Sequence, residues 1–537
     1  MTDDRDAGAP ILLRGGSVVG PDGLHPADVL VEGDRIAAVG PGLPAPDDVR
    51  TVDCGGRTVL AGAVDAHSHA GSRVFDEDVQ LALLRQGVTT IVTGQDGVGP
   101  APGDGTWADR YFAAIDGPHP RYRGGGIAGL LATYDGTTPV NVATLVPAGT
   151  VRHEVVGDED RPATAEETAA MRALVRRGLA EGALGLASGL DYVPGLYADT
   201  AELAALCAEV AGVDGVYVSH VRGGYEANLA AGLGEVAAIV RSAGVRAHVS
   251  HLHAPVDTAL AVLEDLAAAR VHPTFDAYPY SRGCTILSML LLPAALARPG
   301  TDDLARAVAD DAGRQRVRSA LLERVTARPD LGPGWADQVT LSHVASPEHH
   351  GLQGRTLAAA AAASGTDPVD LAIDVLVAAD LQVTAIMRVP HPRSPADLAP
   401  LVRHPGHTAG SDGIHVGTHP HPRAAGTVAR YLGDFVRAGL LSWPEAQRHL
   451  STTAVEHLGL GDRGVVRPGA VADLAVVDPE LVAARSTYED PTATAVGTDD
   501  VLVAGVPVLA GGHLTGATPG AGIRRTDART PDRTGDR

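Results

Sequence analysis

The sequence predicts an α/β protein, in which a (β/α)8 TIM-like barrel stands beside a small discontinuous β-sandwich domain. Three observations predict this fold. From residue 61 to 277, short apolar strands alternate with helices, as in a parallel barrel. A further strand of the same kind follows only at residues 407–411, and short Gly-rich strands lie near both ends of the chain.

The β-domain is expected from residues 8–60 together with 463–523. Its first part contains short strands broken by Gly, Pro and Asp, and its second part returns to the same pattern. The expected strands are 11–14, 29–32, 35–39 and 57–60 in the first part, and 474–477 and 501–505 in the second.

The barrel is expected from residues 61–462. Its expected strands are 63–65, 89–93, 142–146, 184–187, 216–219, 246–250, 274–277 and 407–411, and its helices 77–86, 164–181, 200–211, 226–243, 256–269, 424–438 and 443–458. Thr164 and Glu167 form the capping-box pattern of a helix start. The segment 281–406 is too long for an ordinary loop, which predicts an insertion that folds over the barrel mouth. Residues 524–537 are polar and charged, which predicts a disordered tail.

Composition excludes several classes of protein. The 537 residues carry 43 basic and 65 acidic side chains, a formal charge of −22. No apolar run has the length of a membrane helix, and the start lacks the features of a signal peptide, so we expect a cytoplasmic protein without membrane partners. An acidic surface repels nucleic acid. Cys54, Cys207 and Cys284 are far apart and predict neither a disulfide framework nor a zinc ribbon.

The chain contains no lysine, so all 43 basic residues are arginine. Nucleotide bias is the simplest origin, because the chain is also rich in Ala, Gly, Pro and Val. The chemical consequence is independent of the origin. No side chain here can form a Schiff base, act as a lysine general base or become a carbamylated-lysine metal bridge.

Histidines recur at the ends of the expected strands. His67 and His69 are two residues apart after a strand, so their side chains face the same way. Alone, such a pair is more often two polar or loop histidines than a metal site. His220 and His251 also end strands, and Asp412 ends the last one, where barrel enzymes hold their chemistry. Four imidazoles and a carboxylate predict a zinc site.

A zinc site of this kind predicts hydrolysis. Zinc lowers the pKa of a bound water toward about 7 and polarises a carbonyl, so hydroxide can attack an amide or ester. Asp412 can take the proton of that water and return it to a leaving amine. The alternative is that Asp412 serves only as a ligand.

The motifs resemble the amidohydrolase superfamily and, within it, the N-acyl-D-amino-acid deacylase (D-aminoacylase) family. The resemblance runs from about residue 11 to 525 and implies a metal-dependent hydrolase barrel. The segments that carry it, besides His67-Ser68-His69 and Ser411-Asp412-Gly413, are residues 87–92, 182–195, 220–222, 250–253, 276–280 and 419–423.

The resemblance implies roles for particular residues. His220 and His251 would hold a tight zinc, and His67, His69 and Asp412 a second, weaker one, with Asp412 as catalytic acid and base. The substrate-binding residues implied in the same way are Arg423, which would pair with the substrate carboxylate, and Tyr192, Tyr280 and His253. For each tyrosine, packing at the barrel mouth is the alternative.

The chain departs from the family pattern at three places. Asp96, in Gly94-Gln95-Asp96-Gly97, stands where the family has a cysteine ligand, and a carboxylate can still bind or bridge zinc. His253 replaces a lysine that contacts the substrate carboxylate, and Ala148 replaces a histidine. We therefore expect Asp96 to be a metal ligand and substrate choice to differ.

The leading hypothesis is zinc-dependent hydrolysis of N-acyl-D-amino acids, small-molecule substrates, to a carboxylate and a free D-amino acid. Another C–N hydrolase on the same scaffold is the main alternative: an isoaspartyl-type dipeptidase, a cyclic-amide hydrolase or a deacetylase of a specialised metabolite. A metal-binding scaffold without catalysis is a further alternative. The sequence leaves the oligomeric state open.

Overall fold

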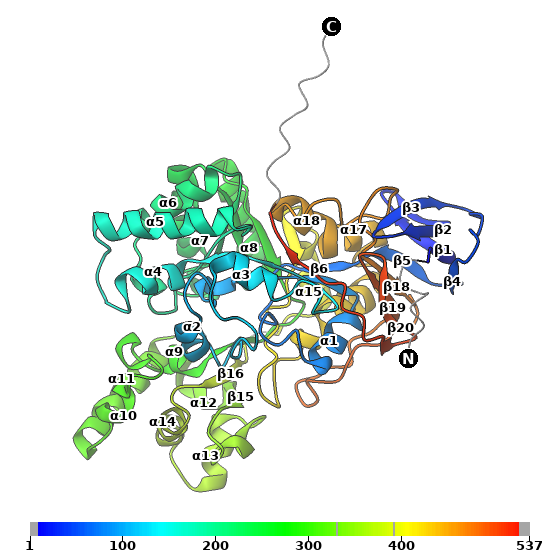
Figure 1. Ribbon diagram of the computed structural model, residues 1–537. Coiled ribbons are helices and arrows are strands. Elements are labelled where there is room, and N and C mark those ends of the chain that lie inside the picture. Colours follow the sequence, from blue (N-terminus) through cyan, green and yellow to red (C-terminus); the bar gives the residue numbers. More distant parts are fainter. Residues whose placement is uncertain (1–8, 329–330, 390–391, 526–537) are drawn as a thin grey trace.

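The computed structural model of the chain describes residues 9–328, 331–389 and 392–525 (Figure 1). Of the predicted tail, only its first two residues belong to these ranges, so the prediction of disorder lies outside the described residues. Within these ranges, no helix is both long and apolar enough to cross a membrane.

Parallel strands form the predicted barrel. Two hydrogen-bonded arcs, β6-β7-β8 and β9-β10-β11-β12-β13-β17, make up its wall. The strands are β6 (Ala63–Asp65), β7 (Val88–Thr93), β8 (Asn141–Thr144), β9 (Val146–Pro147), β10 (Gly185–Gly189), β11 (Val216–His220), β12 (Arg246–Val249), β13 (Thr274–Ala277) and β17 (His407–Ala409).

The two arcs join at both ends, so the barrel is closed. Between β8 and β9 lies only Leu145, so the two segments occupy one position in the wall. On the other side, Ala66 N–H donates to the Ala409 carbonyl at 3.0 Å, and Ser68 pairs with Gly413 in a parallel bridge. With β8 and β9 as one strand, the predicted (β/α)8 barrel is confirmed.

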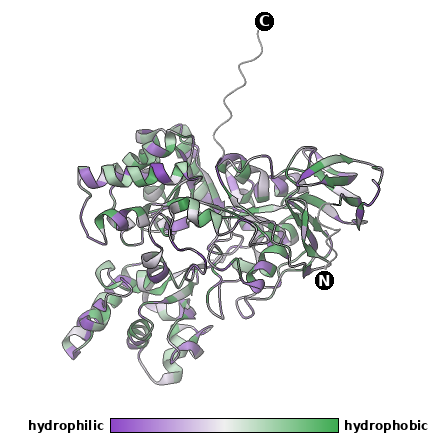
Figure 2. Cartoon of the chain, viewed as in Figure 1, coloured by the Kyte–Doolittle hydropathy of each residue, from purple (hydrophilic) through white to green (hydrophobic). Residues whose placement is uncertain are grey.

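Helices surround this barrel. They are α1 (Glu77–Leu84), α4 (Ala148–Val156), α5 (Ala165–Ala180), α6 (Thr200–Ala211), α7 (Leu229–Ala243), α8 (Val256–Ala268), α15 (Pro395–Val402), α16 (Arg423–Arg430), α17 (Trp443–Gln447) and α18 (Thr453–Leu458), with the short α2 (Thr106–Tyr111) and α3 (Gly126–Ala132) after β7. The predicted capping box is confirmed, because Glu167 N–H donates to Thr164 Oγ1 at 3.2 Å and Thr164 N–H to Glu167 Oε2 at 2.8 Å. Figure 2 shows hydrophilic stretches on outer helices such as α5 beside hydrophobic ones.

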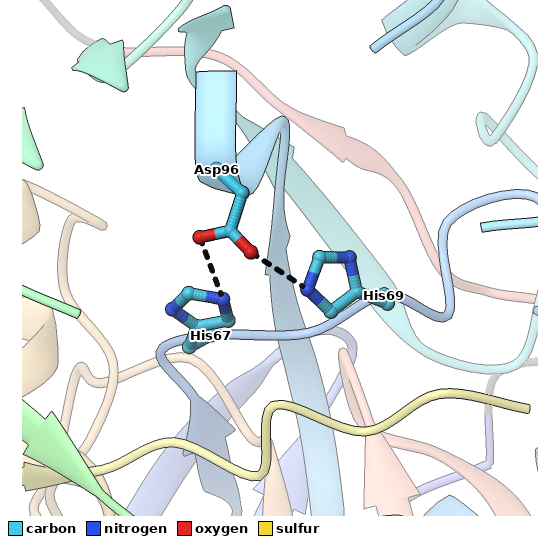
Figure 3. Close-up of side chains that lie close together, drawn as sticks. All are labelled: His67, His69 and Asp96. Atoms are coloured by element: carbon cyan, nitrogen blue, oxygen red, sulfur yellow. Dashed lines mark ion pairs between the residues drawn. The ribbon is translucent and has the colours of Figure 1, made fainter. Parts of the chain in front are cut away.

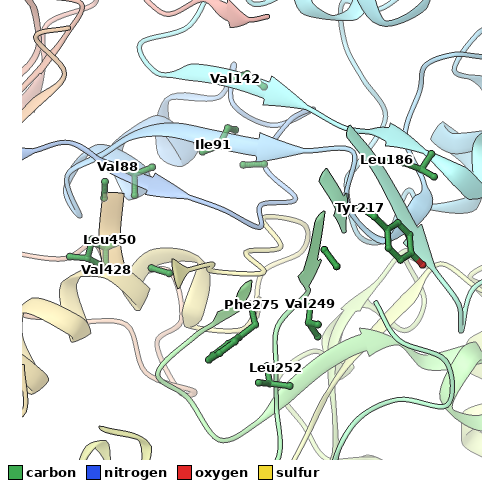
Figure 4. Close-up of a cluster of buried hydrophobic side chains, with 14 of the residues drawn as sticks. Val88, Ile91, Val142, Leu186, Tyr217, Val249, Leu252, Phe275, Val428 and Leu450 are labelled. Carbon is green, nitrogen blue, oxygen red and sulfur yellow. The ribbon is translucent and has the colours of Figure 1, made fainter. Parts of the chain in front are cut away.

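Apolar side chains of strands and helices form the main core (Figure 4). Ile91 of β7, Leu186 of β10 and Phe275 of β13 are fully buried there, and Val428 of α16 packs in the same cluster. Each such side chain contributes roughly 1.5–3 kcal/mol of burial free energy. This core fixes the strand ends that carry the site.

A nine-stranded sheet combines both ends of the described chain. Its strands are β1 (Ile11–Gly20), β2 (Gly23–Glu32), β3 (Arg35–Gly40), β4 (Arg50–Asp53), β5 (Thr58–Ala61), β18 (Leu474–Val477), β19 (Thr498–Val503), β20 (Val506–Ala510) and β21 (His513–Leu514). β5 and β18 pair antiparallel, so the early and late strands lie side by side, as the blue and red arrows of Figure 1 show. Ile36 N–H donates to the Ala470 carbonyl at 2.9 Å, so the sheet curls back and encloses its own apolar cluster.

The chain between β13 and α15 forms a lobe with a core of its own. An antiparallel sheet, β14-β16-β15, lies in this lobe. Its elements are β14 (Gly283–Ile286), α9 (Leu287–Leu291), α10 (Asp303–Ala307), α11 (Asp311–Ala327), α12 (Trp335–Gln338), β15 (Val339–Val344), α13 (Leu357–Ser364), α14 (Pro368–Ala378) and β16 (Val383–Met387). A cavity of about 1500 Å³ lies between this lobe and the loops at the carboxyl ends of the barrel strands.

The domain limits given by the sequence stay predictions. One short strand bears on them: β22 (Gly522–Ile523) pairs in parallel with β8 of the barrel rather than with the nine-stranded sheet. The last two residues of the predicted β-domain therefore lie against the barrel wall.

Candidate metal centre

The loop after β6 carries two histidines, of which His69 lines the large cavity. His67 and His69 are buried, and their ring centroids lie 5.3 Å apart. Ser68, between them, forms the bridge to Gly413 that closes the barrel. The two-residue period sends both imidazoles to the face opposite the Ser68 side chain, toward Asp96 (Figure 3).

Asp96 lies between two pairs of histidines. It stands in a tight 3₁₀ turn, η1 (Gln95–Gly97), after β7, with a left-handed φ of 55°. Its Oδ2 lies 3.6 Å from His69 Nε2, and its Oδ1 lies 3.7 Å from His67 Nε2. Gly189 at the end of β10 permits this placement, since a Cβ there would collide with the Asp96 carbonyl oxygen.

The second pair approaches the same carboxylate at Oδ1, the oxygen that also faces His67. Oδ1 of Asp96 is 3.6 Å from His220 Nδ1 and 3.5 Å from His251 Nε2. These two ring nitrogens are 3.1 Å apart. Asp96 is thus the member shared by two groups of potential metal ligands, one with His67 and His69 and one with His220 and His251.

The donor set fits zinc. Two ligands that each lie about 2.0–2.1 Å from a tetrahedral zinc are themselves about 3.3–3.5 Å apart. The separations around Asp96 are close to this value and too long for hydrogen bonds. Moreover, Asp96 Oδ1 and His67 Nε2 are buried without a hydrogen-bond partner among the described residues, which is costly unless a cation binds there.

Three further carboxylates hold the imidazoles from behind. Asp116 Oδ1 lies 2.7 Å from His69 Nδ1, Asp191 Oδ2 lies 3.3 Å from His220 Nε2, and Asp276 Oδ2 lies 3.5 Å from His67 Nδ1. In these three histidines, one ring nitrogen faces Asp96 and the other a carboxylate, which is a hydrogen-bond partner at His69 and His220 and a longer contact at His67. Such partners orient metal ligands.

These carboxylates change the protonation of the site when no metal is bound. Burial by itself lowers the pKa of His220, but Asp96 and Asp191 outweigh it and raise that pKa to about 10. Burial likewise acts to raise the pKa of Asp96, while His220 and the neighbouring imidazoles hold it well below its usual range. A bound cation would take the place of the imidazole protons.

Sequence reasoning missed these three residues. Asp191 and Asp276 each end or follow a barrel strand within the motifs of the family resemblance, and this position was the available signal. Asp116 lies in the long segment after β7, between α2 and α3, where no motif marks it.

Asp412 and Arg423 form a buried pair beside the histidines. Asp412 Oδ1 lies 3.3 Å from His69 Nε2, and its Oδ2 lies 2.8 Å from Arg423 Nη2. Arg423 Nε also donates to the Asp412 backbone carbonyl at 2.7 Å. Burial acts to raise the pKa of Asp412, but the Arg423 guanidinium together with His251, His69 and His67 outweighs it and lowers that pKa, so the carboxylate stays ionised.

The cavity exposes only part of the predicted set. Its walls include His69, Asp96, Tyr192, His220, His251, His253 and Asp412. His67 and Arg423 are fully buried, and Arg423 lies against the ring of Tyr278, which does line the cavity. Tyr280 lies outside the cavity wall, and its hydroxyl donates to the Pro422 carbonyl at 3.4 Å. The substrate-binding roles of Arg423 and Tyr280 stay predictions.

His253 has two protein partners. Its Nδ1 lies 2.8 Å from Glu226 Oε1, and its Nε2 lies 3.1 Å from the Ser281 carbonyl oxygen. Glu226 is in turn paired with Arg393. Both ring nitrogens of His253 thus already face acceptors, and the residue links Glu226 to the cavity wall. Its predicted contact with a substrate carboxylate requires one of these contacts to break.

Comparison with known proteins identifies the family. Residues 50–509 match the model of the amidohydrolase family. The chain belongs to this family. A D-aminoacylase of Alcaligenes xylosoxydans xylosoxydans is 31% identical over 96% of this chain and 98% of its own, and an N-acyl-D-glutamate deacylase of the same organism is 29% identical over 93% of each chain. The resemblance drawn from the motifs is thereby confirmed.

Solved structures of family members have the same fold. The crystal structure of a D-aminoacylase has a TM-score of 0.79 at 29% identity and covers 96% of this chain and 99% of that one. An N-acyl-D-glutamate deacylase from Bordetella bronchiseptica, complexed with zinc and a phosphonate mimic of the tetrahedral intermediate, has a TM-score of 0.79 at 28% identity, over 97% and 100% of the two chains. A binuclear metal centre is described for a D-aminoacylase whose TM-score is 0.78.

Proposed function

We propose that this family member is a zinc-dependent hydrolase of N-acyl-D-amino acids, which releases a carboxylate and a free D-amino acid. One observation carries the proposal: the Asp96 carboxylate, on the wall of the large cavity, is shared by two groups of potential metal ligands, one with His67 and His69 and one with His220 and His251. The similarity to D-aminoacylase and to N-acyl-D-glutamate deacylase gives the substrate class.

The metal ligands would be these four histidines with Asp96, and Asp412 would complete the group around His67 and His69. We assign the tighter position to His220, His251 and Asp96 and the weaker one to the other group. When bound, zinc supplies Lewis acidity, which polarises a carbonyl and makes water acidic enough to attack near neutral pH.

Asp412 is assigned the proton transfers. Its carboxylate faces the cavity and is kept ionised by Arg423 together with the nearby imidazoles, so it can accept the proton of the attacking water. The same oxygen can then donate this proton to the leaving amine nitrogen. Arg423 holds the carboxylate of Asp412 and its backbone carbonyl in place, which restricts the direction of the transfer.

Arg423 is also the proposed partner of the substrate carboxylate. Its Nη1 is buried without a hydrogen-bond partner among the described residues, so it could pair with a substrate carboxylate once the neighbouring Tyr278 ring, which lines the cavity, moved aside. Tyr192 and Tyr278 on the cavity wall offer phenolic donors nearby. A guanidinium and two phenols would fix the amino-acid half of the substrate.

The test is a hydrolysis panel with zinc-loaded protein. Paired N-acetyl-D and N-acetyl-L amino acids with acidic, apolar and sulfur side chains are compared by kcat/KM. We expect turnover of D isomers that is lost with a chelator and restored by zinc. Hydrolysis of L isomers alone would overturn the stereochemical assignment. Stoichiometric zinc without turnover of any member would favour a non-catalytic scaffold.

A further inference from the structure

A second cavity opens beside the candidate metal centre. It has a volume of about 200 Å³ and shares Asp191, Gly223, Met289, Arg324 and Arg328 with the wall of the large cavity. We call this space the annex. It lies between the loop that follows β10 and the first elements of the lobe, α9 and η4 (Ala294–Leu296).

The mouth of the annex adjoins a candidate metal ligand. Asp191 Oδ2 lies 3.3 Å from Nε2 of His220, and Asp191 Oδ1 accepts from the Gly223 N–H at 2.7 Å. Arg324 on the opposite side donates to the carbonyls of Met289 and Leu290 at 2.9 and 3.3 Å. Asp191 and Arg324 therefore already have protein partners, and Arg328 is the third charged residue at the mouth.

Beyond this mouth the annex is lined by apolar groups. They are the side chains of Leu196, Ile286, Leu292, Ala294 and Ala297 and the ring of Tyr111. The Tyr111 hydroxyl accepts from the Val193 N–H at 2.9 Å, which fixes the ring against the loop after β10. Arg324 and Arg328 stand at the mouth, but the apolar walls beyond them offer no charged partner to a carboxylate, which would lose its hydration on entry.

We propose that the annex is the subsite for an aliphatic acyl chain of the substrate. The acyl substituent is bonded directly to the carbonyl carbon that must lie at the metal ligands, so it is the apolar group nearest to the mouth beside His220. The amino-acid side chain is attached farther away, beyond the amide nitrogen. This inference rests on the proposed function and extends it: N-acyl groups longer than acetyl are the preferred substrates.

The test compares N-acetyl, N-butanoyl, N-hexanoyl and N-octanoyl derivatives of the D-amino acid that the panel accepts best. Burial of each methylene is expected to raise kcat/KM about three- to fourfold until the annex is full. Ala294→Phe fills the annex and should lower the octanoyl-to-acetyl ratio of kcat/KM at least tenfold. Ala320→Phe is the matched control, because Ala320 lines only the large cavity, and it should keep the ratio.

The outcomes separate the two proposals. The acyl subsite would be overturned if the acetyl substrate is hydrolysed but kcat/KM does not rise along the acyl series, or if kcat/KM rises equally in Ala294→Phe. The proposed function would still stand. If Ala294→Phe loses turnover of substrates with bulky amino-acid side chains rather than of substrates with long acyl groups, the acyl subsite is overturned as well. Ala297→Phe repeats the test if the melting temperature of Ala294→Phe shows unfolding.

A wild-type protein that hydrolyses no member of the series contradicts the proposed function instead. The annex is then tested by calorimetric binding of octanoate and acetate. We expect octanoate to bind the wild type and Ala320→Phe with equal affinity, and to bind Ala294→Phe at least tenfold more weakly. Equal binding to all three proteins would overturn it.

Discussion

The guanidinium of Arg423 contacts Asp412 twice, through Nη2 to the carboxylate at 2.8 Å and through Nε to the backbone carbonyl at 2.7 Å. Arg423 is fully buried, and Asp412 is nearly so. Removal of the guanidinium would leave a buried carboxylate without its strongest cationic partner. The pair therefore links the stability of the site to its chemistry.

Arg423→Met should destabilise the metal-free protein by about 3–5 kcal/mol, because the buried charge of Asp412 is then uncompensated. The measurement is denaturant unfolding in the presence of a chelator. The double variant Arg423→Met/Asp412→Asn carries neither charge and should recover at least half of the loss. Strictly additive losses in the double variant would show that the two residues do not act as a pair.

Asp412→Asn should bind zinc but lose turnover by about 100- to 10,000-fold, because an amide cannot accept the proton of the attacking water. Zinc content and kcat are measured on the same preparation. Asp257→Asn, at an exposed carboxylate on the same cavity wall, is the control and should keep its kcat. An unchanged kcat in Asp412→Asn would remove Asp412 from the proton transfers.

Asp116→Asn should weaken zinc binding about 10- to 100-fold, since the carboxylate that orients His69 through Nδ1 is lost. Competition with a chromogenic chelator gives the affinity. Asp109→Asn, in the same segment, keeps His69 and its partner intact and should bind zinc as the wild type does. Equal affinities of all three proteins would contradict the assignment.

Acid should destabilise the fold through His119. Its Nδ1 accepts from the Tyr122 N–H at 2.9 Å, and burial, with Arg123 and Arg121, lowers its pKa to about 4. The unfolded chain takes up this proton near pH 6.5 and the folded chain only near pH 4. The free energy of unfolding should therefore decrease as the pH drops from about 6.5 to about 4, and this residue contributes about 1–3 kcal/mol of the decrease.

His119→Gln removes this titration. Its free energy of unfolding, measured by urea unfolding from pH 7 to 4, should fall less steeply with decreasing pH than that of the wild type. Parallel pH profiles of the two proteins would show that His119 has the same pKa in the folded and the unfolded chain.

Sequence periodicity predicted the barrel because apolar strands and helices alternate regularly there. It placed the start of the helix at residue 226 three residues early, since residues 226–228 form a 3₁₀ turn, η3 (Glu226–Asn228), before α7. The π-helical turn η7 (Tyr431–Val436) after α16 also left no trace in the pattern, because it keeps the apolar spacing of a helix. The strand β4 was missed because Arg50–Asp53 contains only one strongly apolar residue.

The candidate metal ligands could be named from the sequence because each follows a barrel strand, and such ends meet on one face. The detailed contacts of Arg423 and Tyr280 could not. Whether a side chain near a strand end faces the cavity depends on the loop conformation, and Tyr278 rather than Tyr280 lines the wall. The lobe supplies one side of the annex, and its packing against the barrel depends on contacts far apart in the sequence.

The zinc content of Asp96→Ala tests the central claim most directly, because both histidine pairs are proposed to share this carboxylate. Protein stripped with a chelator, reloaded with zinc and desalted is measured by atomic emission, with Asp257→Ala as the control. The account predicts that Asp96→Ala retains less than half the zinc per chain of the wild type and of the control. Full zinc occupancy in Asp96→Ala would contradict it.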